Sequence, residues 1–199
     1  MMPIKRAELA FRSSISTSRQ LRDAGCTRAP AALAIESRIA EVGDAERIAA
    51  LIRELAAKFI LCDFSAEGKS RFLSDHTSMA VVDRIRTRFR YRIAESDGEL
   101  VAVIGVRDWA HLSHLFVAEA FQGQGLGRAL WEQAKAECLE RGNPGTFTVN
   151  SSKKAVPVYE TFGFVATASV QVIGGVQFVP MRLETRSVAH DGMTDCGQL

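Results

Sequence analysis

The chain is poor in the residue patterns that mark a metal centre, a disulfide scaffold or a membrane anchor. Its four cysteines, Cys26, Cys62, Cys138 and Cys196, form no Cys-x-x-Cys pair and no metal-ligand spacing, so we expect isolated reduced thiols. No apolar run approaches the ~18 residues of a membrane-spanning helix, and no cluster of histidines with carboxylates suggests a metal site. We therefore expect a cytoplasmic protein that has no metal and no membrane partner.

Charge of a single sign is also lacking, since the formal net charge is only +2. Residues 1–35 are the exception, with six basic and two acidic side chains and a polar run from Ser13 to Ser18. This composition is typical of a disordered tail, of a start codon placed too early, or of an organelle transit peptide. A secretory signal is not expected because no continuous apolar segment is present. We predict a disordered or targeting-like basic tail over 1–35, a domain over 36–185 and a flexible tail over 186–199.

Hydrophobic periodicity predicts the order of the elements in the domain. The expected strands lie at 39–42, 89–93, 100–106, 112–117, 146–150, 166–173 and 176–183. The expected helices are 45–59, one within 64–86, 126–138 and a short one that begins near Pro157. Asp44 is the expected cap of the first helix, and Gly142 ends the third. The apolar residues expected to be buried on the second helix are Phe72, Leu73, Met79, Val82 and Ile85.

The most informative segment is a glycine-rich turn between the strand at 112–117 and the helix at 126–138. Its glycines, Gly123, Gly125 and Gly127, do not have the Gly-x-Gly-x-x-Gly spacing of dinucleotide-binding folds, and no Lys-Ser or Lys-Thr follows them as in a P-loop. Unpaired backbone N–H groups at a helix start bind anions, and glycine lets the backbone approach a ligand closely. The turn therefore predicts a site for a phosphorylated cofactor.

The spacing Gln-x-x-Gly-x-Gly from Gln122 to Gly127 resembles the pyrophosphate-binding motif of the GNAT superfamily, whose N-acetyltransferases bind acetyl-coenzyme A. Further along, Asn150 ends a strand, and Tyr159 stands four residues before a Gly-Phe pair, similar to the family's Tyr-x-x-x-Gly-Phe segment. The resemblance covers about residues 36–185. It implies a single α/β (α+β) domain with a mixed, largely antiparallel sheet of six to seven strands flanked by helices.

The resemblance also implies an acyltransferase that moves an acetyl group from acetyl-coenzyme A to a primary amine of a small molecule or protein by direct attack. The residues that it assigns to the coenzyme are Leu115, Phe116, Val117, Gln122, Gly123, Gln124, Gly125, Leu126, Gly127, Arg128 and Asn150. The N–H of Val117 would stabilise the developing oxyanion, and Arg128 and Arg141 would pair with the pyrophosphate. Tyr159 would be the general acid, because a phenol with a pKa near ~10 can give its proton to a leaving thiolate whose thiol has a pKa near ~8.5. Its alternative role is that of a buried aromatic residue that anchors its helix.

The general base is open at this point. His111 and His114 flank Ser113 on the strand before the turn. Residues three apart on a regular strand point to opposite faces, so at most one of the two imidazoles can face the substrate. Either histidine could instead be a surface or pocket-lining residue. The other candidates are an ordered water and the carboxylates of Glu95, Asp108 and Glu119.

Two other functions are compatible with the sequence. A GNAT-like domain could bind acyl-coenzyme A as a sensor or structural module without turnover, although Tyr159 argues against this. Alternating arginines could bind an acidic partner or nucleic acid, but a solvated strand face explains them, and we do not expect nucleic acid. These arginines are Arg84, Arg86, Arg88, Arg90 and Arg92. The acceptor amine, the acyl chain and the choice between monomer and homodimer stay open.

Overall fold

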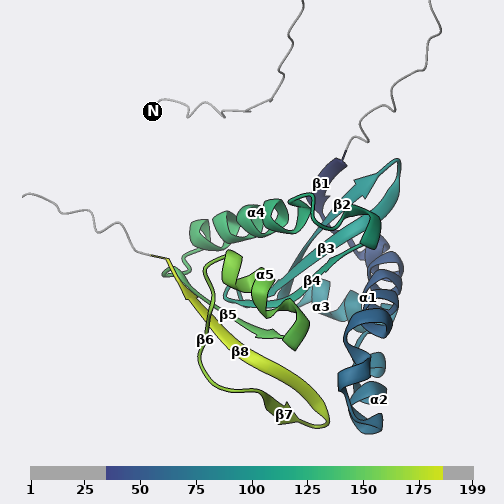
Figure 1. The fold of residues 1–199 in the computed structure, drawn as a ribbon. Coiled ribbons are helices and arrows are strands. Elements are labelled where there is room, and N and C mark those ends of the chain that lie inside the picture. Colours follow the sequence, from purple (N-terminus) through teal and green to yellow (C-terminus); the bar gives the residue numbers. More distant parts are fainter. Residues whose placement is uncertain (1–34, 186–199) are drawn as a thin grey trace, which may run out of the picture. The chain divides into compact units, whose positions relative to one another are not determined.

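A sheet of eight strands forms the centre of the computed structural model, which describes residues 35–185 of the chain. The strands are β1 (Ile35–Ile39), β2 (Phe89–Ser96), β3 (Glu99–Arg107), β4 (His111–Val117), β5 (Thr146–Ser151), β6 (Val165–Ala166), β7 (Gln171–Ile173) and β8 (Val176–Glu184). Their spatial order is β1-β2-β3-β4-β5-β8-β6, with β7 also paired to β8 (Figure 1). The β4–β5 pair is parallel and the other pairs are antiparallel. The predicted mixed, largely antiparallel sheet is therefore confirmed. The tails predicted over 1–35 and 186–199 fall outside the described residues, apart from Ile35.

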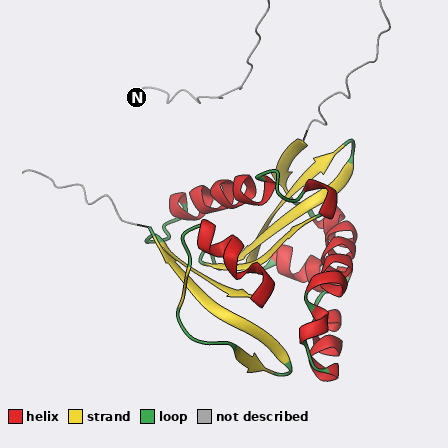
Figure 2. Ribbon diagram, viewed as in Figure 1, coloured by secondary structure: helices red, strands yellow, loops and turns green. Residues whose placement is uncertain are grey.

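Helices cover both faces of this sheet, as Figure 2 shows in red against the yellow strands. They are α1 (Ala45–Phe59), α2 (Ala66–Asp75), α3 (Ser78–Arg86), α4 (Leu126–Glu140) and α5 (Val156–Thr161). On one face, Trp131 of α4 packs edge-on against Phe147 of β5, with their ring centroids 5.2 Å apart. On the other face, Ile48 and Ile52 of α1 pack in one buried cluster with Tyr91 of β2. The removal of such apolar side chains from water is the main contribution that holds the helices on the two faces of the sheet.

The first strand lies earlier than the sequence predicts. It ends at Ile39, and Val42, which we expected in the strand, begins a short 3-10 helix, Val42–Asp44. The side chain of Asp44 explains why the strand ends early. Its Oδ2 accepts a hydrogen bond from the backbone N–H of Glu41 at 2.8 Å and so closes a tight turn. Asp44 does occupy the N-cap position of α1, as predicted, but its side chain makes no capping hydrogen bond to that helix.

The segment 64–86 contains two helices where we predicted one. Ser65 Oγ accepts the N–H of Gly68 at the start of α2, and Thr77 Oγ1 accepts the N–H of Ala80 at the start of α3. Each hydroxyl satisfies an amide that a new helix start would leave unpaired, so Thr77 divides the segment. Met79 lies at the start of α3 with 76% of its surface exposed, contrary to the prediction, and Val81 is the fully buried residue instead.

The predicted strand 166–173 is split into β6 and β7, which is why the sheet has eight strands. Thr167 donates its N–H to the carbonyl of Pro180 at 2.9 Å, at the point where the β6–β8 ladder ends. Pro180 has no N–H to return the next ladder bond, so the pairing stops there and resumes only at β7.

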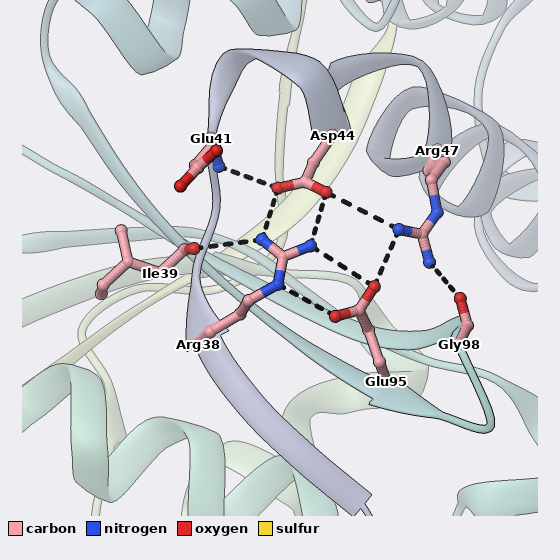
Figure 3. Close-up of polar contacts among 7 residues, drawn as sticks. All are labelled: Arg38, Ile39, Glu41, Asp44, Arg47, Glu95 and Gly98. Atoms are coloured by element: carbon pink, nitrogen blue, oxygen red, sulfur yellow. Dashed lines mark hydrogen bonds and ion pairs between the residues drawn. The ribbon is translucent and has the colours of Figure 1, made fainter.

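A network of charged side chains joins β1, the start of α1 and β2 (Figure 3). Asp44 is buried, and its two carboxylate oxygens accept the Nη1 and Nη2 groups of Arg38 at 2.7 and 2.8 Å. Arg38 Nε also donates to Glu95 at 2.9 Å, and Arg47 Nη1 donates to the same carboxylate at 2.8 Å. The Arg38 guanidinium, through these hydrogen bonds, lowers the pKa of Asp44 below its usual range. The network therefore ties the amino-terminal edge of the sheet to α1.

Replacing Asp44 with asparagine should lower the free energy of unfolding by about 2 kcal/mol, because the charge-assisted bonds to Arg38 are lost. Glu46→Gln, which removes an exposed carboxylate two residues away, should change it by less than about 0.5 kcal/mol. Urea unfolding at pH 7 measures both. The lowered pKa means that Asp44 stabilises the fold above the usual carboxylate range and that this contribution is lost as the pH falls through the folded pKa. The deficit of Asp44→Asn should therefore shrink in acid, and equal losses in the two variants would contradict this role.

Candidate active site

A cleft of about 560 Å³ opens beside the end of β4. Strands β4 and β5 pair only at His111 with Thr148 and at Leu112 with Val149, and then they diverge. The cleft lies along β4 beyond this point, between the glycine turn and α5 on one side and the end of α1 on the other. Its position therefore depends on a parallel strand pair that is only two residues long.

The divergence leaves backbone groups of β4 facing the gap. Ala118 donates its N–H to the carbonyl of Val101 on β3 at 2.8 Å. Because N–H groups alternate in direction along a strand, those of Leu115 and Val117 point to the opposite side, where β5 has turned away. The side chain of Gln122 reaches the same side and donates Nε2 to the carbonyl of Val117 at 2.8 Å. A ligand in the cleft can therefore receive hydrogen bonds from β4 as an added strand would.

The glycine turn presents a row of free donors at the start of α4. Gly123 and Gly125 have φ angles of 72° and 81°, which side-chain-bearing residues rarely adopt. The backbone N–H groups of residues 123–128 have no hydrogen-bond partner within residues 35–185. They point away from a fifteen-residue helix, whose dipole favours negative charge at this end. The turn is thus built to hold an anion such as a pyrophosphate.

The structure brings together most of the residues predicted to hold the coenzyme. Those that line the cleft are Leu115, Phe116, Val117, Gln122, Gly123, Gly125, Leu126, Gly127 and Arg128. Gln124 is not among the lining residues, since its Nε2 donates to the carbonyl of Ala120 instead. Asn150 lies on β5 with an exposed side chain and does not line the cleft either. Arg141 stacks on Trp109 beyond the other end of α4, which is about 20 Å long, so it is too far away to contact a ligand at the turn.

Tyr159 lies on α5 and lines the same cleft. Its ring is held by edge-to-face contacts with Phe162 and Phe164, and the residue is 7% exposed. Its hydroxyl has no hydrogen-bond partner among residues 35–185, and burial raises the pKa of Tyr159 well above its usual value. The group therefore stays protonated at neutral pH and is free to donate to a ligand in the cleft.

The two histidines of β4 lie on one face of the sheet, contrary to the expectation for a regular strand. A β-bulge opposite Gly105 and Val106 leaves Ser113 unpaired and reverses the alternation between His111 and His114. His111 lies beside Thr148, with Nδ1 2.8 Å from Oγ1, and burial with the Arg107 charge lowers its pKa to about 4. His114 is buried, and both of its ring nitrogens are hydrogen-bonded. Neither imidazole is among the residues that line the cleft.

The other candidate bases are held in ion pairs, and so are three of the five arginines, Arg88, Arg90 and Arg92. Glu95 belongs to the network with Arg38, Asp108 pairs with Arg88, and Glu119 pairs with Lys58. The neighbouring arginines lower the pKa of Glu95 and of Asp108. Arg90 and Arg92 both pair with Glu137 of α4, and Arg84 and Arg86 lie on α3 and not on the strand. Arg88, Arg90 and Arg92 are thus paired with neighbouring acids, and the five arginines, which are divided between α3 and the region of β2, do not form one strand face.

Several cleft residues were not predicted. They come from the end of α1, from the 3-10 helix before the glycine turn and from the segment around Tyr159, namely Leu55, Phe59, Ile60, Phe121, Ser152, Lys154, Ala155, Val158, Thr161 and Phe162. Phe162 is three residues after Tyr159 and four after Val158, which are the spacings of neighbours on one helix face, so the local sequence contained a signal for these residues. Nothing near Leu55 or Phe59 in the sequence places α1 beside β4, which lies more than fifty residues further along the chain.

Two properties of the described residues bear on metals and membranes. Residues 35–185 contain no group of three or more His, Cys, Asp or Glu side chains placed to hold a metal ion. No helix in the same range has the length and apolar character needed to cross a membrane.

A mixed sheet, a parallel strand pair that diverges beside a cleft and a glycine turn that opens a helix define the fold class of this chain. Residues 60–185 match the acetyltransferase (GNAT) domain, and the chain belongs to this family. The resemblance inferred from the Gln-x-x-Gly-x-Gly and Tyr-x-x-x-Gly-Phe segments is thereby confirmed.

The chain is also similar to individual proteins. Acetyltransferase Atu2258 of Agrobacterium fabrum is 32% identical over 73 residues, which are 37% of this chain and 53% of that protein, so the match spans about half the length of this curated relative. A GCN5-related N-acetyltransferase from Rhodopseudomonas palustris has a similar structure, with a TM-score of 0.65, 19% identity and coverage of 79% of this chain and 100% of that chain. The PaiA N-acetyltransferase from Thermoplasma acidophilum, solved in complex with coenzyme A, has a TM-score of 0.62, 17% identity and coverage of 77% and 100%. These structural similarities support the fold.

Proposed function

We propose that this chain transfers an acetyl group from acetyl-coenzyme A to a primary amine of a small molecule or protein, by direct attack of the amine on the thioester. One observation carries the proposal. One cleft is bordered by the glycine turn with its free N–H groups, by Leu115 and Val117 with their gap-facing N–H groups, and by Tyr159 with its unpartnered hydroxyl. These groups suit the three parts of acetyl-coenzyme A that need them. The turn suits the pyrophosphate, the N–H groups of β4 suit the thioester oxygen, and the Tyr159 hydroxyl suits the departing sulfur.

Each group has a distinct task in this reaction. The amides of residues 123–128 hold the pyrophosphate, and the N–H of Val117 stabilises negative charge on the thioester oxygen as the amine attacks. Tyr159 then donates its proton to the departing thiolate. Burial raises the pKa of Tyr159, and the same apolar surroundings disfavour a charged thiolate beside it, so the sulfur is stabilised when it gains the proton.

The incoming amine must lose a proton, and an ordered water suits this step better than either histidine, because neither His111 nor His114 lines the cleft. His111 Nδ1 is hydrogen-bonded to Thr148, and its Nε2 has no partner within residues 35–185. Both nitrogens of His114 are already engaged within the protein. His114 therefore has no free lone pair to take the proton of the incoming amine.

Titration calorimetry with acetyl-coenzyme A, followed by thiol release with amine acceptors, tests this function. Gly127 is the sharpest position for a variant, because its Cβ would be 3.7 Å from the nearest atom of Val117 and needs no unusual φ. Gly127→Ala should bind like the wild type, whereas Gly127→Glu should weaken binding by about 100-fold through charge repulsion with the pyrophosphate. Gly127→Gln, of the same size without the charge, should lie between them. Absence of binding by the folded wild type, or equal losses for the Gln and Glu variants, would refute the assignment of the turn.

A further inference from the structure

A buried chain of hydrogen bonds runs behind the cleft from β2 through β4 to α2. The hydroxyl of Tyr91 is 3.1 Å from His114 Nδ1, and His114 Nε2 is 2.9 Å from His76 Nε2. His76 Nδ1 is 2.7 Å from the carbonyl of Phe72 in α2. Tyr91, His114 and His76 are 1%, 7% and 6% exposed, so water does not compete for these bonds. None of the roles proposed above uses this chain.

The carbonyl of Phe72 determines which group donates in each of these hydrogen bonds. The Phe72 carbonyl can only accept, so His76 carries its hydrogen on Nδ1 and accepts at Nε2. His114 must then donate from Nε2, which leaves its Nδ1 as an acceptor for the Tyr91 hydroxyl. This arrangement holds while both imidazoles are neutral. A second proton on His76 Nε2 would face the N–H of His114, and a second proton on His114 Nδ1 would face the Tyr91 hydroxyl, which would then have to turn and accept.

Neighbouring residues pack closely around Tyr91, His114 and His76. Gly105 lies across the bulge from His114, and a Cβ at this position would be 2.6 Å from Cε1 of Tyr91 and 3.1 Å from His114 Nδ1. Phe72 stacks on the ring of His76 at a centroid distance of 4.0 Å. The charged and titratable groups that act on the two histidines come from every element around them. These are Arg53 of α1, Asp75 of α2, Arg84 of α3, Arg107 of β3 and His111 of β4.

The hydrogen-bonded row of Tyr91, His114 and His76 meets β4 where that strand borders the cleft. His114 lies between the unpaired bulge residue Ser113 and Leu115, the first residue of β4 that lines the cleft. A bulge lacks part of the ladder that fixes a strand, so the side-chain bonds of His114 supply the missing restraint. They also fasten the end of α2 to the same point of the strand.

We propose that Tyr91, His114 and His76 are positioning residues for the proposed acetyl transfer. They hold the bulged segment of β4 so that the N–H groups of Leu115 and Val117 stay aimed at the thioester. This inference rests on the proposed function. The side chains themselves do not touch the donor or the acceptor, and their effect passes through the backbone of β4.

Tyr91→Phe tests the proposal, because it removes one oxygen and keeps the ring. We expect kcat to fall by about 10-fold or more, since small displacements of catalytic donors have large effects on rate, while KM for acetyl-coenzyme A changes by less than about twofold. With acetyl-coenzyme A labelled with ¹³C at the thioester carbonyl, the infrared band of the bound carbonyl should shift toward its position in free solution. His76→Gln, which breaks the chain at its other end, should shift the band in the same direction.

Asp44→Asn is the control for a merely structural role, since it weakens the fold at the far edge of the sheet (Figure 3). It should leave the carbonyl band and kcat unchanged under conditions where it stays folded. An unchanged band and an unchanged kcat in Tyr91→Phe would overturn the positioning role while leaving the acetyltransferase function standing. A folded wild type that does not bind acetyl-coenzyme A would overturn both.

Discussion

Replacing Tyr159 with phenylalanine should lower kcat for acetyl transfer by about 10²- to 10⁴-fold, which is the usual contribution of a positioned general acid. The ring would keep its edge-to-face contacts with Phe162 and Phe164, so α5 and the cleft should stay intact. Only the hydroxyl is lost, and it has no hydrogen-bond partner among residues 35–185, so no protein group becomes unsatisfied. Binding of acetyl-coenzyme A should change by less than about twofold.

The measurement is steady-state thiol release together with calorimetric titration of acetyl-coenzyme A. Tyr91→Phe provides the matched control, because Tyr91 and Tyr159 are the two tyrosines of the chain and the chemical change is the same. Its rate should fall less, since Tyr91 acts through β4 and not on the leaving group. If Tyr159→Phe kept the full rate, the tyrosine would be only an anchor for α5. A wild type that binds the coenzyme but shows no turnover with any amine would instead support the sensor or structural role.

Acid should unfold the protein at a pH well above that expected from its carboxylates alone, because two buried histidines must gain protons. Burial lowers the pKa of His76 to about 4 and lowers that of His114 well below its ordinary value, with the neighbouring His76 adding to the effect. In the unfolded chain both groups titrate near ~6.5. The unfolded state therefore binds more protons below this pH, and stability that is fully present above ~6.5 is lost as the pH falls toward 4.

The expected loss is large. A change from the ordinary value of 6.5 to about 4 for His76 corresponds to about 3 kcal/mol between pH 7 and pH 4, and His114 adds to this figure. Urea unfolding at several pH values between 4 and 7 measures the slope. His76→Gln should be less stable than the wild type at pH 7 yet lose less stability on acidification. His111 titrates in the same window, so the slope should flatten without disappearing, and an unchanged slope in His76→Gln would contradict the prediction.

Local spacing determined the parts of the site that are built from backbone. The glycine turn, the start of α4 at Leu126 and the start of α5 next to Pro157 lie where the sequence predicts them. Gly142 likewise ends α4 with a φ of 94°. Each depends on conformational limits of glycine or proline, or on a helical apolar period, within a few residues. The same reasoning placed Tyr159 on a short helix, and the structure puts that helix beside the turn.

Tertiary structure decided where side chains point and which distant segments meet. One unpaired residue at Ser113 turned His111 and His114 to the same face, and a one-residue shift of this kind reverses every later side chain without a sequence signal of its own. The contact between His76 and His114 joins residues 38 positions apart. Arg38, which pairs with the nearby Asp44, is also hydrogen-bonded to Glu95 of β2, a residue 57 positions further along the chain. These features depend on packing between elements, and a pattern read along the chain contains only the contacts within each element.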